Sequence, residues 1–144
     1  MTVSSSFDGV QASQRQSQKF FYILAVLFNL CAITQVLTVG LAYFYNPEWW
    51  NAHVWLVRGY SGLSLILLVW AYWIPFSPQV RRLAVSLPIL LGLQFLTIHL
   101  KFPLPLGVLH PLIGFALFSA STNLVHRVWR TLNPSLEEAL ERQG

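Results

Sequence analysis

Three of the four histidines in this 144-residue chain fall near the ends of long apolar segments. They are His53, His99 and His110. A neutral imidazole is a common ligand for metal ions and for porphyrin iron. Ionisable side chains are costly in hydrocarbon, so several of them at one depth of a membrane bundle indicate a functional site. Whether these imidazoles meet depends on the elements that carry them.

The composition predicts a membrane protein. The chain is 55% apolar and only 10% charged, whereas an ordinary soluble domain is about 25% charged. A helix crosses a hydrocarbon core of roughly 30 Å with about 20 apolar residues. Four stretches fit this length: 20–45, 50–74, 83–99 and 106–129. We therefore predict an all-α integral membrane four-helix bundle as one domain.

The remaining segments are polar. Residues 1–19 are rich in Ser and Gln and lack apolar periodicity, so we expect a flexible N-terminus before the transmembrane domain of residues 20–130. Residues 131–144 form a C-terminal tail, in which Ser135 and Glu138 match a capping box for a short helix.

Basic residues predict the orientation. Most of them lie in the N-terminus, the second connector and the C-terminus; Lys101 lies in a loop on the other side and Arg58 within a span. Since Lys and Arg near span ends stay cytoplasmic, we predict cytoplasmic termini in a bacterial inner membrane, or stromal termini in a thylakoid membrane. No basic face remains for nucleic acid. The expected partners are the lipid bilayer and other membrane subunits or a second copy.

Two histidines have matched depths. Helices two and four both start on the exoplasmic side, so His53 lies roughly 9 Å along one helix and His110 roughly 8 Å along the other. Two imidazoles from parallel helices could hold one b-type haem, because its iron takes an axial nitrogen from each face. His126 lies roughly 24 Å further along helix four and cannot serve this site. The alternative is that each imidazole bonds a carbonyl or hydroxyl between helices.

Small and polar neighbours complete the predicted site. Gly114 lies one turn after His110, while Gly59 and Gly62 lie about two turns after His53, and small residues permit close approach of a flat macrocycle. His99 ends helix three closer to the surface, where it could touch a cofactor or quinone. The polar side chains of Gln35, Gln94 and Thr97 are expected to form hydrogen bonds between helices.

Arg58 needs an anion, because a guanidinium two turns inside a span is costly when unpaired. No Asp or Glu lies inside any span, which leaves a haem propionate, a lipid phosphate, a quinone oxygen or an acid of another subunit. Five residues separate Arg58 from His53, so the two point about 140° apart. Trp55 is placed to cover the guanidinium by a cation-π contact.

The segments Ala52-His53-Val54 and Leu109-His110-Pro111, with Gly114 following, resemble the small four-helix transmembrane cytochrome b group. The resemblance is closest to compact bacterial four-span proteins of unassigned function. It implies an electron-transfer protein with one haem b held by His53 and His110. Helix two has no second histidine to pair with His126, so a second haem is not expected.

Other functions remain open. The five acids all lie outside the spans, and no phosphate-binding loop or catalytic triad is visible, which disfavours acid-base catalysis without deciding whether the chain is an enzyme. A structural or assembly subunit of a respiratory or photosynthetic membrane complex is the main alternative. Such a subunit would bind chlorophyll or lipid through one histidine. A transporter module would require oligomerisation around a polar pore.

Overall fold

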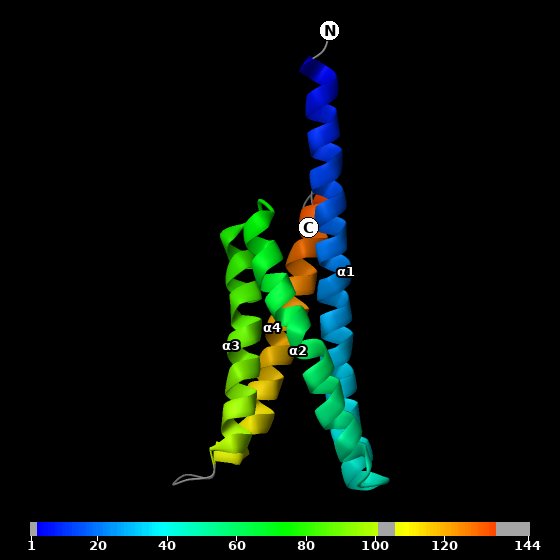
Figure 1. The fold of residues 1–144 in the computed structure, drawn as a ribbon, viewed down its shortest axis with the longest axis vertical. Helices are drawn as coiled ribbons and strands as arrows, with labels where there is room; N and C mark the ends of the chain where they lie inside the picture. The colour runs from blue at the N-terminus through cyan, green and yellow to red at the C-terminus, as the bar shows by residue number, and fades with distance from the viewer. Residues whose placement is uncertain (1–2, 101–105, 135–144) are drawn as a thin grey trace, which may run out of the picture.

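The computed structural model describes residues 3–100 and 106–134, which contain α-helices, one short 3₁₀ turn and no strand (Figure 1). The prediction of an all-α chain with four long helices is confirmed, and each of the four is long and apolar enough to cross a membrane. The elements are α1 (Val3–Phe44), α2 (Trp49–Trp73), α3 (Pro78–His99), η1 (Leu106–Leu109) and α4 (His110–Leu132).

The helix ends differ from the expected borders at three places. Helix α4 starts at His110, after the 3₁₀ turn η1, instead of at residue 106, and it ends at Leu132 instead of residue 129. Helix α1 starts at Val3, where the polar composition predicts a flexible segment, because a helix nucleated in the apolar stretch propagates through Gln, Arg and Ala residues that favour it. Helix α3 starts at Pro78 instead of residue 83; Ser77 caps it by accepting a hydrogen bond from the Val80 N–H. Lys101 and the short helix expected near Ser135 lie outside the described residues.

The four helices form two hairpins, α1–α2 and α3–α4. Helix α1 packs on α2 and α4, and α3 packs on α4 and α2. On the two diagonals, α1 with α3 and α2 with α4, no described Cα atoms approach within 8 Å. The hairpins lie together at the end carrying the α2–α3 turn and diverge toward the end carrying the α1–α2 turn (Figure 1). We call the first the basic end, because it carries Arg81 and Arg82, and the second the histidine end, because it carries His53 and His110.

The second hairpin repeats the first. Buried positions of α3 follow those of α1 at a spacing of 59 residues, and those of α4 follow α2 at 57. The α1 and α3 pairs are Phe21 and Val80, Ala25 and Ala84, Phe28 and Leu87, Ala32 and Leu91, and Thr38 and Thr97. The α2 and α4 pairs are Tyr60 and Leu117, Ser64 and Ser121, Leu67 and Leu124, and Ala71 and Val128. Because α1 and α3 run in the same direction, the hairpins are related by an approximate twofold axis along the bundle.

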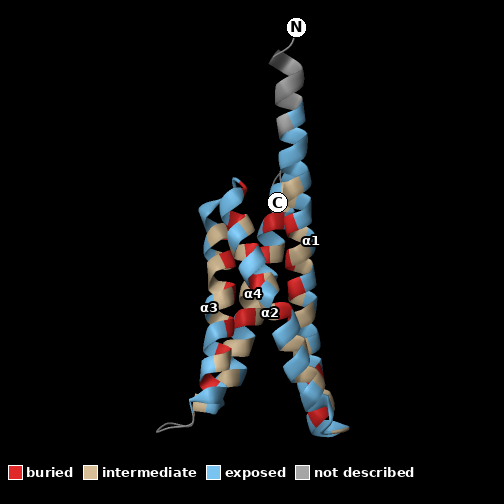
Figure 2. Ribbon diagram, viewed as in Figure 1, coloured by how far each residue is buried: buried red, intermediate tan, exposed pale blue. Residues whose placement is uncertain are grey.

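Apolar packing holds the hairpins together from the middle of the bundle to the basic end (Figure 2). Phe21 packs on Phe76 with ring centroids 4.7 Å apart. Polar contacts also cross between the hairpins in the described part of the chain: Asn29 Oδ1 accepts hydrogen bonds from Ser121 Oγ (2.7 Å) and Thr122 Oγ1 (3.2 Å). At the histidine end the buried side chains are mainly polar. The core therefore leaves that end to contacts within each hairpin.

Leu67 and Leu124 provide a test of the repeat, because they are fully buried at equivalent positions. Leu67→Ala and Leu124→Ala should each lower the free energy of unfolding by about 2 kcal/mol or more, since each leaves a cavity in a close-packed interface. Leu65→Ala, at an exposed position of α2, should change it by less than about 0.5 kcal/mol. Unfolding of the purified variants in detergent measures all three. A negligible effect of either buried substitution would contradict the equivalence of the hairpins.

Candidate functional site

His53 is fixed by α1 of its own hairpin. Its ring Nδ1 lies 3.2 Å from the backbone carbonyl oxygen of Gln35 and 3.2 Å from Thr38 Oγ1. Thr38 Oγ1 in turn donates a hydrogen bond to the same Gln35 carbonyl (2.8 Å). A carbonyl can only accept, so the hydrogen bond from His53 to it places the proton on Nδ1. The lone pair of the neutral ring is then at Nε2.

His110 repeats this arrangement in the second hairpin. Its Nδ1 lies 3.2 Å from the carbonyl oxygen of Gln94 and 3.4 Å from Thr97 Oγ1. Thr97 Oγ1 donates to the Gln94 carbonyl (2.9 Å). His110 stands at the start of α4, and Pro111 follows it in the first turn, where a missing N–H leaves no helical bond unmade. The same tautomer follows, with the lone pair at Nε2.

The two imidazoles occupy equivalent positions of the two hairpins at the histidine end. Both are half-buried. Neither Nε2 has a hydrogen-bond partner among the described residues. In the described part of the chain, no group of three or more His, Cys, Asp or Glu side chains could hold a metal ion. Each hairpin thus presents one imidazole whose Nε2 has no partner among the described residues.

Two glutamine side chains border this pair. Gln35 Nε2 donates to the carbonyl oxygen of His53 (2.9 Å), which confirms the hydrogen bond between helices expected for Gln35. The amide oxygens Oε1 of Gln35 and Gln94 are both buried without a hydrogen-bond partner in the described residues. Buried acceptors are rarely left unsatisfied in proteins. The two lie at equivalent positions of the two hairpins, and a third unpartnered buried atom, Arg81 Nε, lies at the basic end.

Gly114 lies against Gln94. A Cβ atom at this glycine would stand 2.7 Å from Gln94 Nε2, so the absence of a side chain lets the amide lie against α4. Gly114 is thus part of the packing around His110, one helical turn away.

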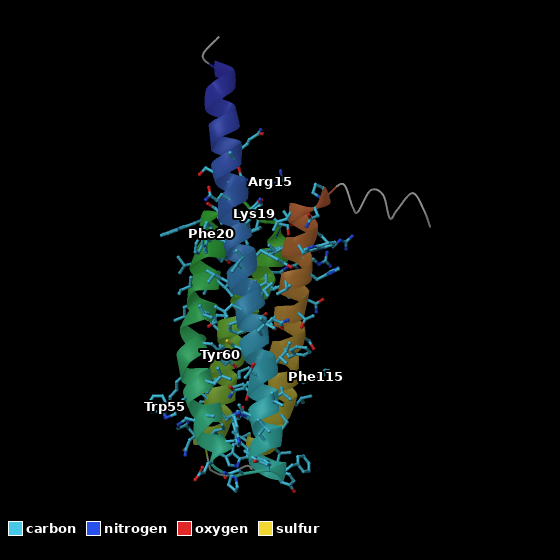
Figure 3. All side chains as sticks on the ribbon, turned by 90° about the vertical axis from the view of Figure 1, so that its right-hand side faces the viewer. Arg15, Lys19, Phe20, Trp55, Tyr60 and Phe115 are labelled. Carbon is cyan, nitrogen blue, oxygen red and sulfur yellow. The ribbon has the colours of Figure 1, made fainter. Side chains whose placement is uncertain are left out.

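The structure does not gather the other predicted site residues around the two imidazoles. Gly59 and Gly62 are exposed on α2, and a Cβ atom at either would meet open space. Arg58 is also exposed; its Cζ lies 5.6 Å from the centroid of the Trp55 ring, as expected for the cation-π contact. Trp55 points away from the bundle (Figure 3). His99 is exposed, with Nδ1 bonded to the Phe95 carbonyl one turn earlier (2.7 Å).

Thr38 has a role that the sequence analysis did not identify. The signal was the repeated pattern Gln-x-Leu-Thr at Gln35–Thr38 and Gln94–Thr97, each followed by a histidine at the start of the next helix. In a chain this apolar, a similarity over four residues often arises by chance. The repeated burial pattern shows that these two segments occupy equivalent positions in the two hairpins.

Comparison with known proteins adds one match. A family model described as "Family of unknown function (DUF6220)" matches residues 35–99. The matched segment contains the Gln and Thr residues of both hairpins together with His53, and it ends before His110. No curated protein and no solved structure matches the chain.

The two kinds of glycine environment predict different responses to alanine. Gly62→Ala should raise the free energy of unfolding by about 0.5 to 1 kcal/mol, because alanine favours the helix and its Cβ meets no neighbour. Gly114→Ala should give a smaller gain or a loss, because the Gln94 amide must move. Thermal unfolding of both variants beside the wild type measures the difference. Equal gains would show that the contact between Gly114 and Gln94 is unimportant.

Proposed function

We propose that this protein is a membrane electron carrier that holds one b-type haem between α2 and α4, with His53 and His110 as axial ligands. The observation that carries the proposal is the equivalence of the two imidazoles. Each is fixed through Nδ1 to a backbone carbonyl of the preceding helix, and each has an Nε2 without a protein partner. Two such imidazoles, one from each of two hairpins related by a twofold axis, would suit an iron that binds two histidine nitrogens.

The donor set fits a porphyrin better than a bare metal ion. Protein zinc sites use three or four side-chain ligands, and the described residues offer no group of three. In haem b the macrocycle itself supplies four nitrogens, so two histidines complete the coordination. Because α2 and α4 are diagonal neighbours without close backbone contact, their imidazoles can approach a shared group from opposite sides.

The surrounding residues control the ligands. A histidine that donates its ring N–H to a carbonyl is held in one tautomer and one orientation. Its other ring nitrogen then becomes a stronger electron-pair donor to a metal. The Gln35 and Gln94 carbonyls have this role, and the Thr38 and Thr97 hydroxyls hold those carbonyls in place. When bound, haem b supplies a one-electron redox centre. No Asp or Glu lies in the four membrane-length segments, so the chain provides no carboxylate there to move a proton.

We further propose a bacterial inner membrane, or a thylakoid membrane, with both termini on the cytoplasmic or stromal side. The support is the gathering of cations at the basic end, where the start of the apolar part of α1, the start of α3 and the end of α4 come together. These cations are Arg15, Lys19, Arg81, Arg82, Arg127 and Arg130. By the positive-inside rule the histidine end then faces the exoplasm. Electrons would be exchanged near that surface.

A second candidate is a quinone or quinol bound at the same position. The observation that favours it is the pair of unpartnered amide oxygens on Gln35 and Gln94. Quinol hydroxyl groups would donate hydrogen bonds to acceptors of this kind, and the imidazole Nε2 atoms would accept others. Haem b and a quinol have different absorption spectra, which separates the two candidates directly.

The reduced-minus-oxidised absorption spectrum of protein purified from a haem-replete host tests the proposal. We expect a sharp b-type band that is lost in both His53→Ala and His110→Ala, because either change removes one axial ligand. His99→Ala and His126→Ala serve as matched controls and should keep the band, since both side chains are exposed away from the pair. A colourless wild-type protein would exclude the haem and favour the quinone candidate.

A further inference from the structure

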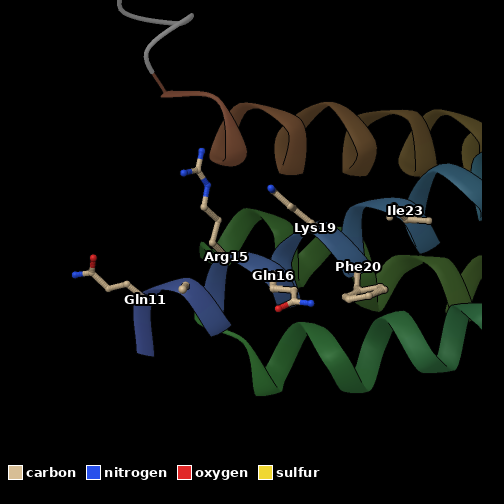
Figure 4. A pocket seen from close by; sticks show the side chains of 7 residues that line it. Gln11, Arg15, Gln16, Lys19, Phe20 and Ile23 are labelled. Carbon is tan, nitrogen blue, oxygen red and sulfur yellow. The ribbon is translucent and has the colours of Figure 1, made fainter. Parts of the chain in front are cut away.

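An open groove of about 760 Å³ lies at the basic end, and all of its described lining residues belong to α1, which extends past the ends of the other helices there (Figure 1, Figure 4). It is a feature separate from the histidine pair, which lies at the opposite end. Its lining includes Gln11, Arg15, Gln16, Lys19, Phe20 and Ile23.

The upper part of the groove is cationic. Arg15 and Lys19 are four residues apart and therefore lie on the same side of α1. Figure 4 shows both side chains extending from α1 toward the carboxyl end of α4. The described residues that line the groove include no Asp or Glu. The charge of this lining is therefore positive and favours an anion.

The lower part of the groove is apolar. Phe20 and Ile23 follow the cations directly, and their side chains are 51% and 57% exposed. Ile23 lies only about 6 Å along the helix axis from Lys19. The apolar segment of α1 begins at Phe20, so the cations are at headgroup level and the two apolar side chains at the level of acyl chains. A soluble anion would use only the upper part, whereas an anionic phospholipid would use both.

The groove also departs from the internal repeat. Helix α3 begins at Pro78 directly after the α2–α3 turn, so the second hairpin has no counterpart to the extension of α1. Its nearest cations are Arg81, which lies over the Tyr72 ring at 5.7 Å, and Arg82, which is exposed. The positive-inside rule requires only cations near the span ends, and it does not require α1 to extend past the other helices. We infer that this groove binds one anionic phospholipid, with its phosphate between Arg15 and Lys19 and an acyl chain along Phe20 and Ile23.

The test compares binding of phosphatidylglycerol and phosphatidylcholine to the full chain in detergent, by native mass spectrometry and by the thermal midpoint. The wild type should bind phosphatidylglycerol more tightly and gain thermal stability from it. Arg15→Gln combined with Lys19→Gln should weaken that binding about 25-fold, from the loss of two cation contacts with the headgroup. Arg82→Gln is the matched control, because it removes a charge from the same end without touching the groove, and it should bind as the wild type does.

Three results would overturn the inference. The first is equal binding of the two lipids by the wild type, and the second is an equal loss in Arg82→Gln and the double variant. The third concerns the acids of the C-terminal segment. If changing Glu137, Glu138 and Glu141 to Gln markedly strengthens phosphatidylglycerol binding, the chain's own acids are the occupant. His53→Ala should leave lipid binding unchanged, so the inference stands or falls independently of the haem.

Discussion

The hydrogen bond from an imidazole Nδ1 to a backbone carbonyl is the interaction on which the histidine end depends. A histidine in hydrocarbon needs a polar partner, yet almost every carbonyl of a membrane helix is already used by the helix itself. Here the carbonyl of Gln35 accepts from a histidine of the next helix, and the hydroxyl of Thr38 supports the same oxygen. This contact fixes how α1 and α2 face each other near their connecting turn. It also decides which ring nitrogen is left to bind something else.

The second hairpin repeats this arrangement of glutamine, threonine and histidine, so the candidate site has two imidazoles. The same three residue types recur as Gln94, Thr97 and His110, with the same contacts of the ring Nδ1 and of the threonine hydroxyl, and the twofold relation of the hairpins places one such ring on each of them. Apolar packing joins the hairpins only from their middle to the basic end, so the histidine end can remain apart. One hairpin alone would present a single imidazole and no second ligand. The candidate function therefore follows from the pairing of two similar halves.

Much of the architecture could be predicted from the sequence, because long apolar segments and the prolines between them determine the number of helices and their approximate ends. The matched depth of His53 and His110 is a prediction from the same count of residues, although α4 itself begins only at His110. The rotation of each helix could not be predicted. In a chain with apolar residues on every side, nothing in the sequence shows that Gly59 and Gly62 face outward while Gly114 faces Gln94. Residues 3–19 look flexible by composition, but they continue a helix that the apolar segment has already started.

The electron paramagnetic resonance spectrum of the oxidised, purified protein tests the central claim most directly, because it reports the ligands on both faces of the iron. Equivalent imidazoles from the two hairpins predict one low-spin ferric species, with one haem b per chain. A high-spin signal would mean that only one histidine reaches the iron. The absence of any haem signal would mean that the paired imidazoles hold a different group, and either result would contradict the account.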